Sequence, residues 1–411
     1  MAMIEIISKI VDQMAVVCKP QKTFICLLMK YILAAHGKLN FRNLSRYGHT
    51  SEKTISRNFE KAFDSVAFNL LLIEQYVPQK ARLIAGFDPS FIEKSGRHTE
   101  GLGKYWNGSA GCAEKGLEVG LFSVIDVDKK DAYAVSAKQT LESEKTSSDK
   151  SEDTRVNQYL EHTIECAARL PLSIKLLVVD AYFYKQKYVQ GIKKRTNLHI
   201  VSKMRNDANL RYIFAGEQLG RGRPKKFDGK FDINDISRLS CEGTIEDKEI
   251  KENIDLYSGI VHSVVLEMSV KVVVLEIKRK EKISRILLYS TDLELSAMDI
   301  HLFYASRFQI EFQFRDAKQF TGLADCQART TIKLNYHFNA SFMALNLAKI
   351  FHHSTPEKKP FSMASIKAYY YNETLLESFL SNSDLNQTLI KRSEAYKLAL
   401  SFGTIHDLAF L

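Results

Sequence analysis

The chain has 411 residues, 45% of them hydrophobic and 26% charged, which is enough for two or three domains with sizeable cores. Its formal net charge of +10 favours a polyanionic partner, either nucleic acid or a membrane surface. The apolar stretch at 24–35 is interrupted by Lys30 and is too short to cross a bilayer, so we expect no membrane span. Six scattered cysteines without a C-x-x-C pair argue against a disulfide framework or a zinc site and indicate reduced thiols.

The first 81 residues carry helical patterns, and we expect them to form a helical domain. Within them, FRNLSRYGHTSEKTISRNFEKAF (41–63) resembles a helix-turn-helix, with a glycine stop and then a threonine or serine at 50–51 to cap the second helix. Lys53 and Arg57 lie on that second helix, where cations suit DNA phosphates. An ordinary helical hairpin is an equally good interpretation.

Residues 82–205 follow the order strand, strand, strand, helix, strand, helix, strand. This is the order of an RNase H-like α/β fold, a mixed sheet flanked by helices. The expected elements are strands at 82–92, 116–127 and 131–140, a polar surface loop at 141–154, a helix near 155–169, a buried strand at 174–184 and a strand at 198–205.

Basic and then β-rich sequence interrupts this order, and strand-rich sequence resumes at 283–293. We therefore expect an insertion within one discontinuous domain. The predicted organisation is a helix-turn-helix-like DNA-binding domain at 1–81, the first part of the RNase H-like domain at 82–205, a basic and β-rich insertion at 206–290, the second part of that domain at 291–351, and a helical C-terminal region at 352–411.

The segment YASRFQIEFQFRDAKQF (304–320) predicts a helix with one polar stripe. An α-helix turns by about 100° per residue, so residues at these spacings share a narrow face. The remaining faces are largely apolar, which indicates a helix packed into a core with its polar stripe open to a cleft. The stripe consists of Tyr304, Arg307, Glu311 and Lys318, with Arg315 beside it.

Two aspartates stand in apolar strand sequence. Asp88 lies in the first strand and Asp180 ends a buried strand after LLVV. A buried carboxylate needs a partner, because leaving it unpaired is costly. Together with Glu311 they form a plausible three-carboxylate cluster, and hard divalent ions such as Mg²⁺ prefer such oxygen ligands. Two such ions can clamp the attacking and leaving oxygens of a phosphodiester.

The polar stripe matches without a gap the signature Y-x2-R-x3-E-x6-K, and in this the chain resembles the DDE transposases of bacterial insertion sequences, of the insertion-sequence-4 type. FDPSFIEKSG (87–96) resembles the first-aspartate motif of that family, and VVDAYFY (178–184) resembles the second. LLYSTDLELS (287–296) resembles the strand before the signature helix. Glu311 follows Asp180 by 131 positions, which leaves room for the β-rich insertion of the family.

The resemblance implies roles for these residues. Asp88, Asp180 and Glu311 would be the catalytic residues and would bind two Mg²⁺ or Mn²⁺ ions. Tyr304, Arg307 and Lys318 would contact DNA phosphates near the element end, and we add Arg315 to that set. From the residues alone, a salt bridge of Arg307 or Lys318 to Glu311 is the competing interpretation.

Residues 185–226 hold twelve Lys and Arg against two acidic residues. This charge follows the second aspartate in sequence and suits DNA backbone contact. RGRP (221–224) resembles an AT-hook core, although a basic solvated loop is the better explanation of so short a match. From this segment we take five candidate DNA-binding residues, Lys193, Lys194, Arg195, Arg221 and Arg223.

These features predict a cut-and-paste DNA transposase. It would bind terminal inverted repeats, hydrolyse the strand at the element end, and join the freed 3′-hydroxyl to target DNA. We expect a homodimer with two paired ends, in the bacterial cytoplasm and on the nucleoid when bound to DNA, and the resemblance suggests a hairpin intermediate. The alternatives are a catalytically silent DNA-binding regulator derived from a transposase and a nuclease that cleaves without strand transfer.

Overall fold

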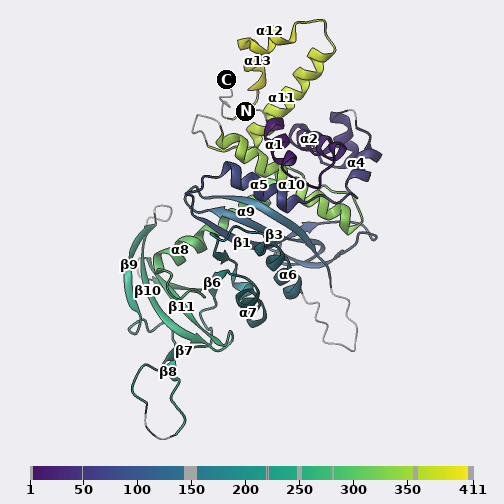
Figure 1. The fold of residues 1–411 in the computed structure, drawn as a ribbon. Coiled ribbons are helices and arrows are strands. Elements are labelled where there is room, and N and C mark those ends of the chain that lie inside the picture. Colours follow the sequence, from purple (N-terminus) through teal and green to yellow (C-terminus); the bar gives the residue numbers. More distant parts are fainter. Residues whose placement is uncertain are drawn as a thin grey trace.

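The computed structural model describes residues 3–48, 50–142, 155–218, 220, 222–247, 252–279, 282–354 and 360–405. Figure 1 shows helices from both ends of the chain together at the top, a mixed sheet in the middle and curved strands at the lower left. Among the described residues, no helix combines the length and apolar composition that crossing a membrane requires.

Twelve strands in the described residues join one hydrogen-bonded sheet. Ten of them follow the order β2-β3-β1-β5-β6-β12-β11-β10-β7-β8, while β4 pairs with β3 and β9 pairs with β10. The strands are β1 Leu83–Glu93, β2 Gly103–Asn107, β3 Cys112–Asp126, β4 Asp131–Thr140, β5 Leu176–Val178, β6 His199–Met204, β7 Leu210–Ile213, β8 Phe227–Lys230, β9 Ser240–Asp247, β10 Glu252–Ser263, β11 Met268–Arg279 and β12 Lys282–Ser290.

Strands β1, β5 and β6 are parallel neighbours, and β3 and β4 extend that sheet antiparallel on the β1 side. The expected order of strands and helices is present with one addition, because β2 makes four strands before α6 where three are expected. One expected element is much shorter, since the strand predicted at 174–184 ends at Val178 and continues as a short 3-10 helix, η2 (Ala181–Phe183). Helices α6 (Arg155–Ala167) and α7 (Gln186–Arg195) connect the parallel strands.

The insertion does not build a separate sheet. Strand β12 pairs with β6 on one side and with β11 on the other, so the inserted strands prolong the central sheet. In Figure 1 they curve away from the helical part as an arm. Helix α8 (Ala297–Ser306) follows β12 and brings the chain back towards the central strands.

Helices from both ends of the chain share one hydrophobic core with the sheet, and the core residues run from Met3 to Tyr370. The central helix α10 (Thr331–His353) packs on β4 and is the most deeply buried. The other helices at the ends are α1 Met3–Asp12, α2 Lys19–Ala34, α3 Phe41–Leu44, η1 Ser45–Tyr47, α4 Glu52–Asn58, α5 Ser65–Tyr76, α11 Met363–Ser381, α12 Gln387–Arg392 and α13 Glu394–Leu400.

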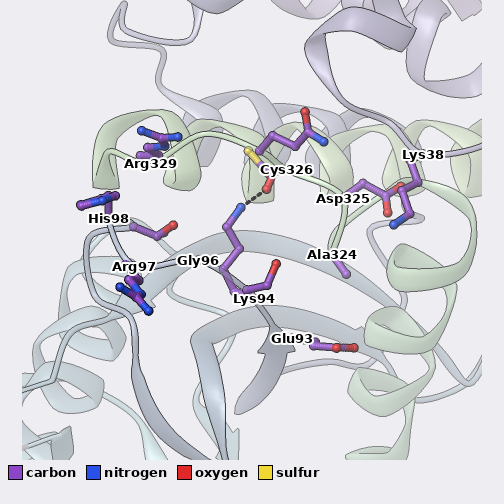
Figure 2. Close-up of a pocket in the computed structure, with 13 residues that line it drawn as sticks. Lys38, Glu93, Lys94, Gly96, Arg97, His98, Ala324, Asp325, Cys326 and Arg329 are labelled. Carbon is purple, nitrogen blue, oxygen red and sulfur yellow. Dashed lines mark hydrogen bonds between the residues drawn. The ribbon is translucent and has the colours of Figure 1, made fainter.

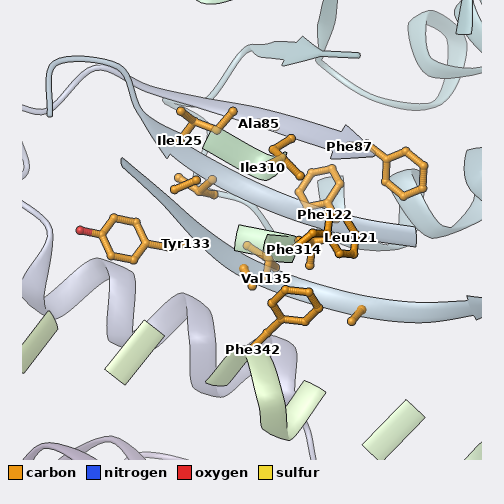
Figure 3. Close-up of a cluster of buried hydrophobic side chains, with 14 of the residues drawn as sticks. Ala85, Phe87, Leu121, Phe122, Ile125, Tyr133, Val135, Ile310, Phe314 and Phe342 are labelled. Carbon is orange, nitrogen blue, oxygen red and sulfur yellow. The ribbon is translucent and has the colours of Figure 1, made fainter. Parts of the chain in front are cut away.

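Helix α9 (Phe308–Phe320) lies against one face of the central strands. Figure 3 shows Ile310 and Phe314 of this helix, with Phe342 of α10, against side chains of β1, β3 and β4. On the opposite face, Phe87 contacts the aromatic rings of Tyr159 and Phe183. Packing on both faces holds α9 and β1 in a fixed relation, and the candidate site lies between them.

Candidate active site

Strand register brings Asp88 and Asp180 to the same edge of the sheet. Strand β1 pairs in parallel with β5, with Ala85 opposite Leu177 and Gly86 opposite Val178. Each aspartate follows two residues after the second of these pairs. The carboxyl ends of parallel strands meet at one edge of a sheet, which is a common position for functional residues.

The alternation of β1 points Asp88 at α9. Successive side chains on a strand face opposite sides, so Gly86, Asp88 and Ser90 share one face. At Gly86 a Cβ atom would lie 2.6 Å from Ile310 Cδ1, which means that the helix packs directly on the strand here. The missing side chain of Gly86 thus permits the close approach that places Asp88 next to α9.

Asp180 occupies a short turn after β5. Its side chain accepts a hydrogen bond from the backbone N–H of Tyr182 at 2.9 Å and caps η2. Its backbone carbonyl accepts a hydrogen bond from Ser202 Oγ of β6 at 2.9 Å. The turn is therefore held on both sides and fixes the carboxylate at the sheet edge.

The predicted single helix from Tyr304 to Lys318 is wrong in one respect, because the chain forms two helices that meet at Arg307. Tyr304 belongs to α8, whereas Glu311 and Lys318 belong to α9. At the junction Ser306 Oγ donates to the carbonyl of Leu302, a bond that bends helices. The polar stripe is therefore divided between two helix ends, with Arg307 at the joint.

Arg307 forms ion pairs with two of the three carboxylates. Its Nη2 donates to Glu311 Oε1 at 2.7 Å and its Nη1 approaches Asp88 Oδ2 at 3.4 Å. The guanidinium is 13% exposed, Asp88 is 16% exposed and Glu311 is 42% exposed. Buried Arg307 Nε has no hydrogen-bond partner among the described residues. The salt bridge of Arg307 to Glu311, the competing interpretation from the sequence, is present and extends to Asp88.

The three carboxylates influence one another electrostatically. Burial raises the pKa of Asp88 from 3.8 to about 7, with Arg307 opposing the rise and with Asp180 and Glu311 adding to it. Burial also raises the pKa of Asp180, again against Arg307. Two of the three acids therefore hold their protons more tightly than free aspartate does, as in a partly desolvated cluster of like charges.

In the described part of the chain, no group of three or more His, Cys, Asp and Glu side chains is arranged closely enough to hold a metal ion. The chemistry of the donors nevertheless fits a hard divalent ion, because all three offer only oxygen. Arg307 forms ion pairs with Asp88 and Glu311.

The remaining residues of the stripe lie at different places. Tyr304 is half-buried, with the Arg307 guanidinium 5.9 Å from the centre of its ring. Lys318 Nζ donates to Ser90 Oγ at 3.0 Å and to the carbonyl of Phe91 at 2.8 Å, so it binds α9 to β1. Arg315 pairs with its neighbour Asp316, at 2.9 Å, and is exposed.

The expected helix-turn-helix has short helices. The first, α3, continues as η1 and ends at Tyr47, and Ser51 caps the second, α4, by accepting from the backbone N–H of Thr54. Lys53 and Arg57 are exposed on α4. Lys333 of α10 donates a hydrogen bond to Ser56 Oγ of α4 and pairs with Glu60, which follows α4, so this part of the chain contacts α10.

The cations that end α7 are close to Asp180 in sequence and lie at the opposite edge of the sheet. Lys193, Lys194 and Arg195 end α7, four residues before β6 begins, whereas Asp180 follows the far end of β5. Arg195 forms two hydrogen bonds with Glu161. Arg223 lies in the exposed loop between β7 and β8, and Arg221 lies outside the described residues.

One cleft near the site was not predicted, although part of its lining belongs to the segment FDPSFIEKSG (87–96). It lies beyond the end of β1 and is lined by residues of three distant segments, around Lys38, Lys94 and Arg329. Isolated cations in loops give no periodic pattern, so a single sequence offers no signal for it. Its cations were accordingly absent from the candidate residues.

One comparison with known proteins gives a match. The family model for the transposase DDE domain matches residues 132–347, a range that includes Asp180 and Glu311 and begins after Asp88. No curated protein matches the sequence. Since the matched residues make up more than half of the chain, the protein belongs to the family defined by the transposase DDE domain.

Proposed function

We propose that the chain is a cut-and-paste DNA transposase of the insertion-sequence-4 type with an RNase H-like catalytic core. It would bind terminal inverted repeats, cleave the element ends and join the 3′-hydroxyl to target DNA, as a homodimer in the bacterial cytoplasm. The single observation that carries the proposal is the electrostatic cluster of Asp88, Asp180 and Glu311 at the edge of the central sheet. The strand order β4-β3-β1-β5-β6 around it supports the RNase H-like assignment.

In this proposal Asp88, Asp180 and Glu311 hold divalent ions, two Mg²⁺ or Mn²⁺. When bound, such ions activate a water or hydroxyl nucleophile and stabilise charge on the phosphodiester. In hydrolysis the P–O3′ bond at the element end breaks and the oxygen leaves as the 3′-hydroxyl. In strand transfer that hydroxyl attacks a target phosphodiester, and a new P–O bond replaces the one that breaks.

The chain's own cations would position the DNA. Arg307 has a buried Nε–H without a partner among the described residues, and a guanidinium suits bidentate phosphate contact. Lys318 already makes two hydrogen bonds to β1, and an ammonium has a third donor for a phosphate. Tyr304 would contact the same backbone. Lys53 and Arg57, exposed on α4, would contact duplex further away.

The test is incubation of the purified protein with labelled element-end duplex and Mg²⁺. We expect strand cleavage by the wild type, no cleavage by Glu311→Ala, and unchanged cleavage by Glu294→Ala, which removes an exposed carboxylate in the loop before α8. Both variants should bind the duplex. Loss of one ligand should remove several kcal/mol of transition-state stabilisation.

The silent regulator is the second candidate, and the ion pairs of Arg307 with two of the three acids favour it. A regulator needs no free metal site and would keep that arrangement with DNA bound. The same assay separates the two functions. A wild-type protein that binds element ends tightly and cleaves in neither Mg²⁺ nor Mn²⁺ is a regulator.

A further inference from the structure

A basic cleft continues the candidate active site along β1. It has a volume of about 700 Å³ and lies between the loop after β1, the segment joining α9 to α10, and the loop that follows α2. Figure 2 shows Arg97, His98 and Arg329 gathered at one end, Lys94 in the middle and Lys38 at the other end.

Three of the cations in the cleft form no ion pair with the described residues. Lys38, Arg97 and Arg329 are exposed, and none has an acidic partner among the described residues. Two acidic residues also line the cleft, Glu93 and Asp325, and the Asp325 carboxylate accepts a hydrogen bond from the backbone of Leu39 at 2.8 Å. The lining therefore has a surplus of positive charge in a concave surface, which focuses the field on an anion.

The walls of the cleft are fixed to one another. Lys94 Nζ donates to the carbonyl of Cys326, and the backbone N–H of Glu100 donates to the carbonyl of Arg329 at 2.8 Å. The Glu100 carboxylate also accepts from the backbone N–H of Thr331 at 2.6 Å. Because these hydrogen bonds already hold the loops in place, a ligand can bind their side chains without a large loss of conformational entropy.

The cleft and the carboxylates lie on one line. Helix α9 runs beside β1 in the same direction, with Ile310 at Gly86 and Lys318 at Ser90. The next contact along the strand is Lys94 with the segment after α9. Asp88 and Lys94 are six residues apart on or just beyond β1, so the separation is about 20 Å at ~3.3 Å per residue. B-DNA rises about 3.4 Å per base pair, so this length corresponds to about six base pairs.

We propose that this cleft binds the sugar-phosphate backbone of DNA about six base pairs from the phosphate that is cleaved. This inference rests on the proposed transposase function, because it assumes that DNA reaches the three carboxylates. Lys38, Arg97 and Arg329 contact phosphates there, and Lys318 lies between them and the carboxylates. The contacts are to backbone, so they raise affinity and set the position of the end without reading sequence.

The first experiment measures binding of a 30-base-pair duplex of arbitrary sequence by fluorescence anisotropy over a salt series. The test variant is Lys38→Gln/Arg97→Gln/Arg329→Gln. The matched control is Lys80→Gln/Lys129→Gln/Lys175→Gln, which loses the same charge at exposed positions near the opposite edge of the parallel strands. Circular dichroism and thermal melting verify the fold of both.

Each lost phosphate contact should reduce the slope of log K against log salt by about 0.9, so the cleft variant should lose roughly two to three units of slope. The control should lose less than half of that. Equal slopes in the two variants overturn the cleft proposal. A wild-type protein that does not bind duplex DNA overturns the proposed function itself, and the two failures are thus distinguishable.

The second experiment locates the contact of the cleft along the duplex. Element-end duplexes are trimmed to four or to ten base pairs beyond the scissile phosphate, on each side in turn. On one side of the scissile phosphate, trimming the duplex to four base pairs should weaken binding of the wild type about as much as the triple substitution does. The same trimming should not weaken binding of the cleft variant any further. If the variant loses the same additional factor as the wild type on both sides, the contact lies elsewhere and the proposal fails.

Discussion

Replacement of Asp88 by asparagine tests the electrostatics of the site without any DNA. Asparagine has nearly the shape of a protonated aspartic acid and carries no charge. Burial raises the pKa of Asp88 from 3.8 to about 7. The folded protein therefore binds the Asp88 proton more tightly than the unfolded chain does, and this proton stabilises the folded state. The stabilisation is complete below about pH 4 and is lost as the pH rises through about 7.

The size of the pKa shift of Asp88 sets the expected change in the free energy of unfolding. Each pKa unit corresponds to about 1.4 kcal/mol, so ionised Asp88 should cost the folded state up to about 4 kcal/mol at pH 8. Asp88→Asn avoids this cost. The free energy of unfolding should therefore be higher for the variant than for the wild type at pH 8, with the difference shrinking towards zero at pH 4.

Urea denaturation in EDTA, at intervals between pH 4 and pH 8.5, measures this difference directly. Groups far from Asp88 titrate alike in both proteins and cancel in the comparison. A matched variant is Asp128→Asn, whose exposed carboxylate pairs with Arg82 on the surface. A stability difference for Asp88→Asn that stays constant from pH 4 to pH 8.5 would refute the assigned electrostatics.

Three further predictions concern the frame of the site. Arg307→Ala should destabilise the metal-free protein by about 3–5 kcal/mol at pH 8, because buried acids lose their cation, and added Mg²⁺ should restore part of the loss in thermal melting. Gly86→Ala should cost about 1–3 kcal/mol in urea denaturation and slow cleavage, since its Cβ would lie 2.6 Å from Ile310 Cδ1. Lys318→Ala should weaken end binding more than Arg315→Ala does in anisotropy, because Arg315 is already paired with its neighbour; the reverse order would exclude the phosphate role of Lys318.

Several elements could be predicted from the sequence because their signals are local. Strands β1, β3, β4 and β6 fall within a few residues of their expected ranges, since each is a run of apolar residues bounded by polar ones. The cap of α4 at Ser51 follows from a serine just before a helical pattern. The spacing of four residues places Arg307 and Glu311 side by side, where they form an ion pair.

Other features depend on contacts between distant segments and had no local signal. The signature is divided at Arg307, next to the hydrogen bond of Ser306 within α8, and the apolar periodicity does not reveal this division. Strand β5 is shorter than its apolar run because the chain turns at Asp180. Lys193, Lys194 and Arg195 lie at the far edge because α7 carries the chain back across the sheet.

The raised pKa of Asp88 also links metal binding to protons, which gives a final prediction. A divalent ion binds ionised carboxylates, so its binding to Asp88, Asp180 and Glu311 must displace the proton that Asp88 holds. With a pKa of about 7, Asp88 is about three-quarters protonated at pH 6.5 and almost fully ionised at pH 8.5. Mg²⁺ binding should thus release close to one proton at pH 6.5 and almost none from this residue at pH 8.5. Isothermal titration calorimetry in buffers of different ionisation enthalpy counts these protons. Because burial also raises the pKa of Asp180, Asp88→Asn should reduce the pH-dependent part without abolishing it. A release that is equal at both pH values in the wild type would show that Asp88 is not a ligand of the ion.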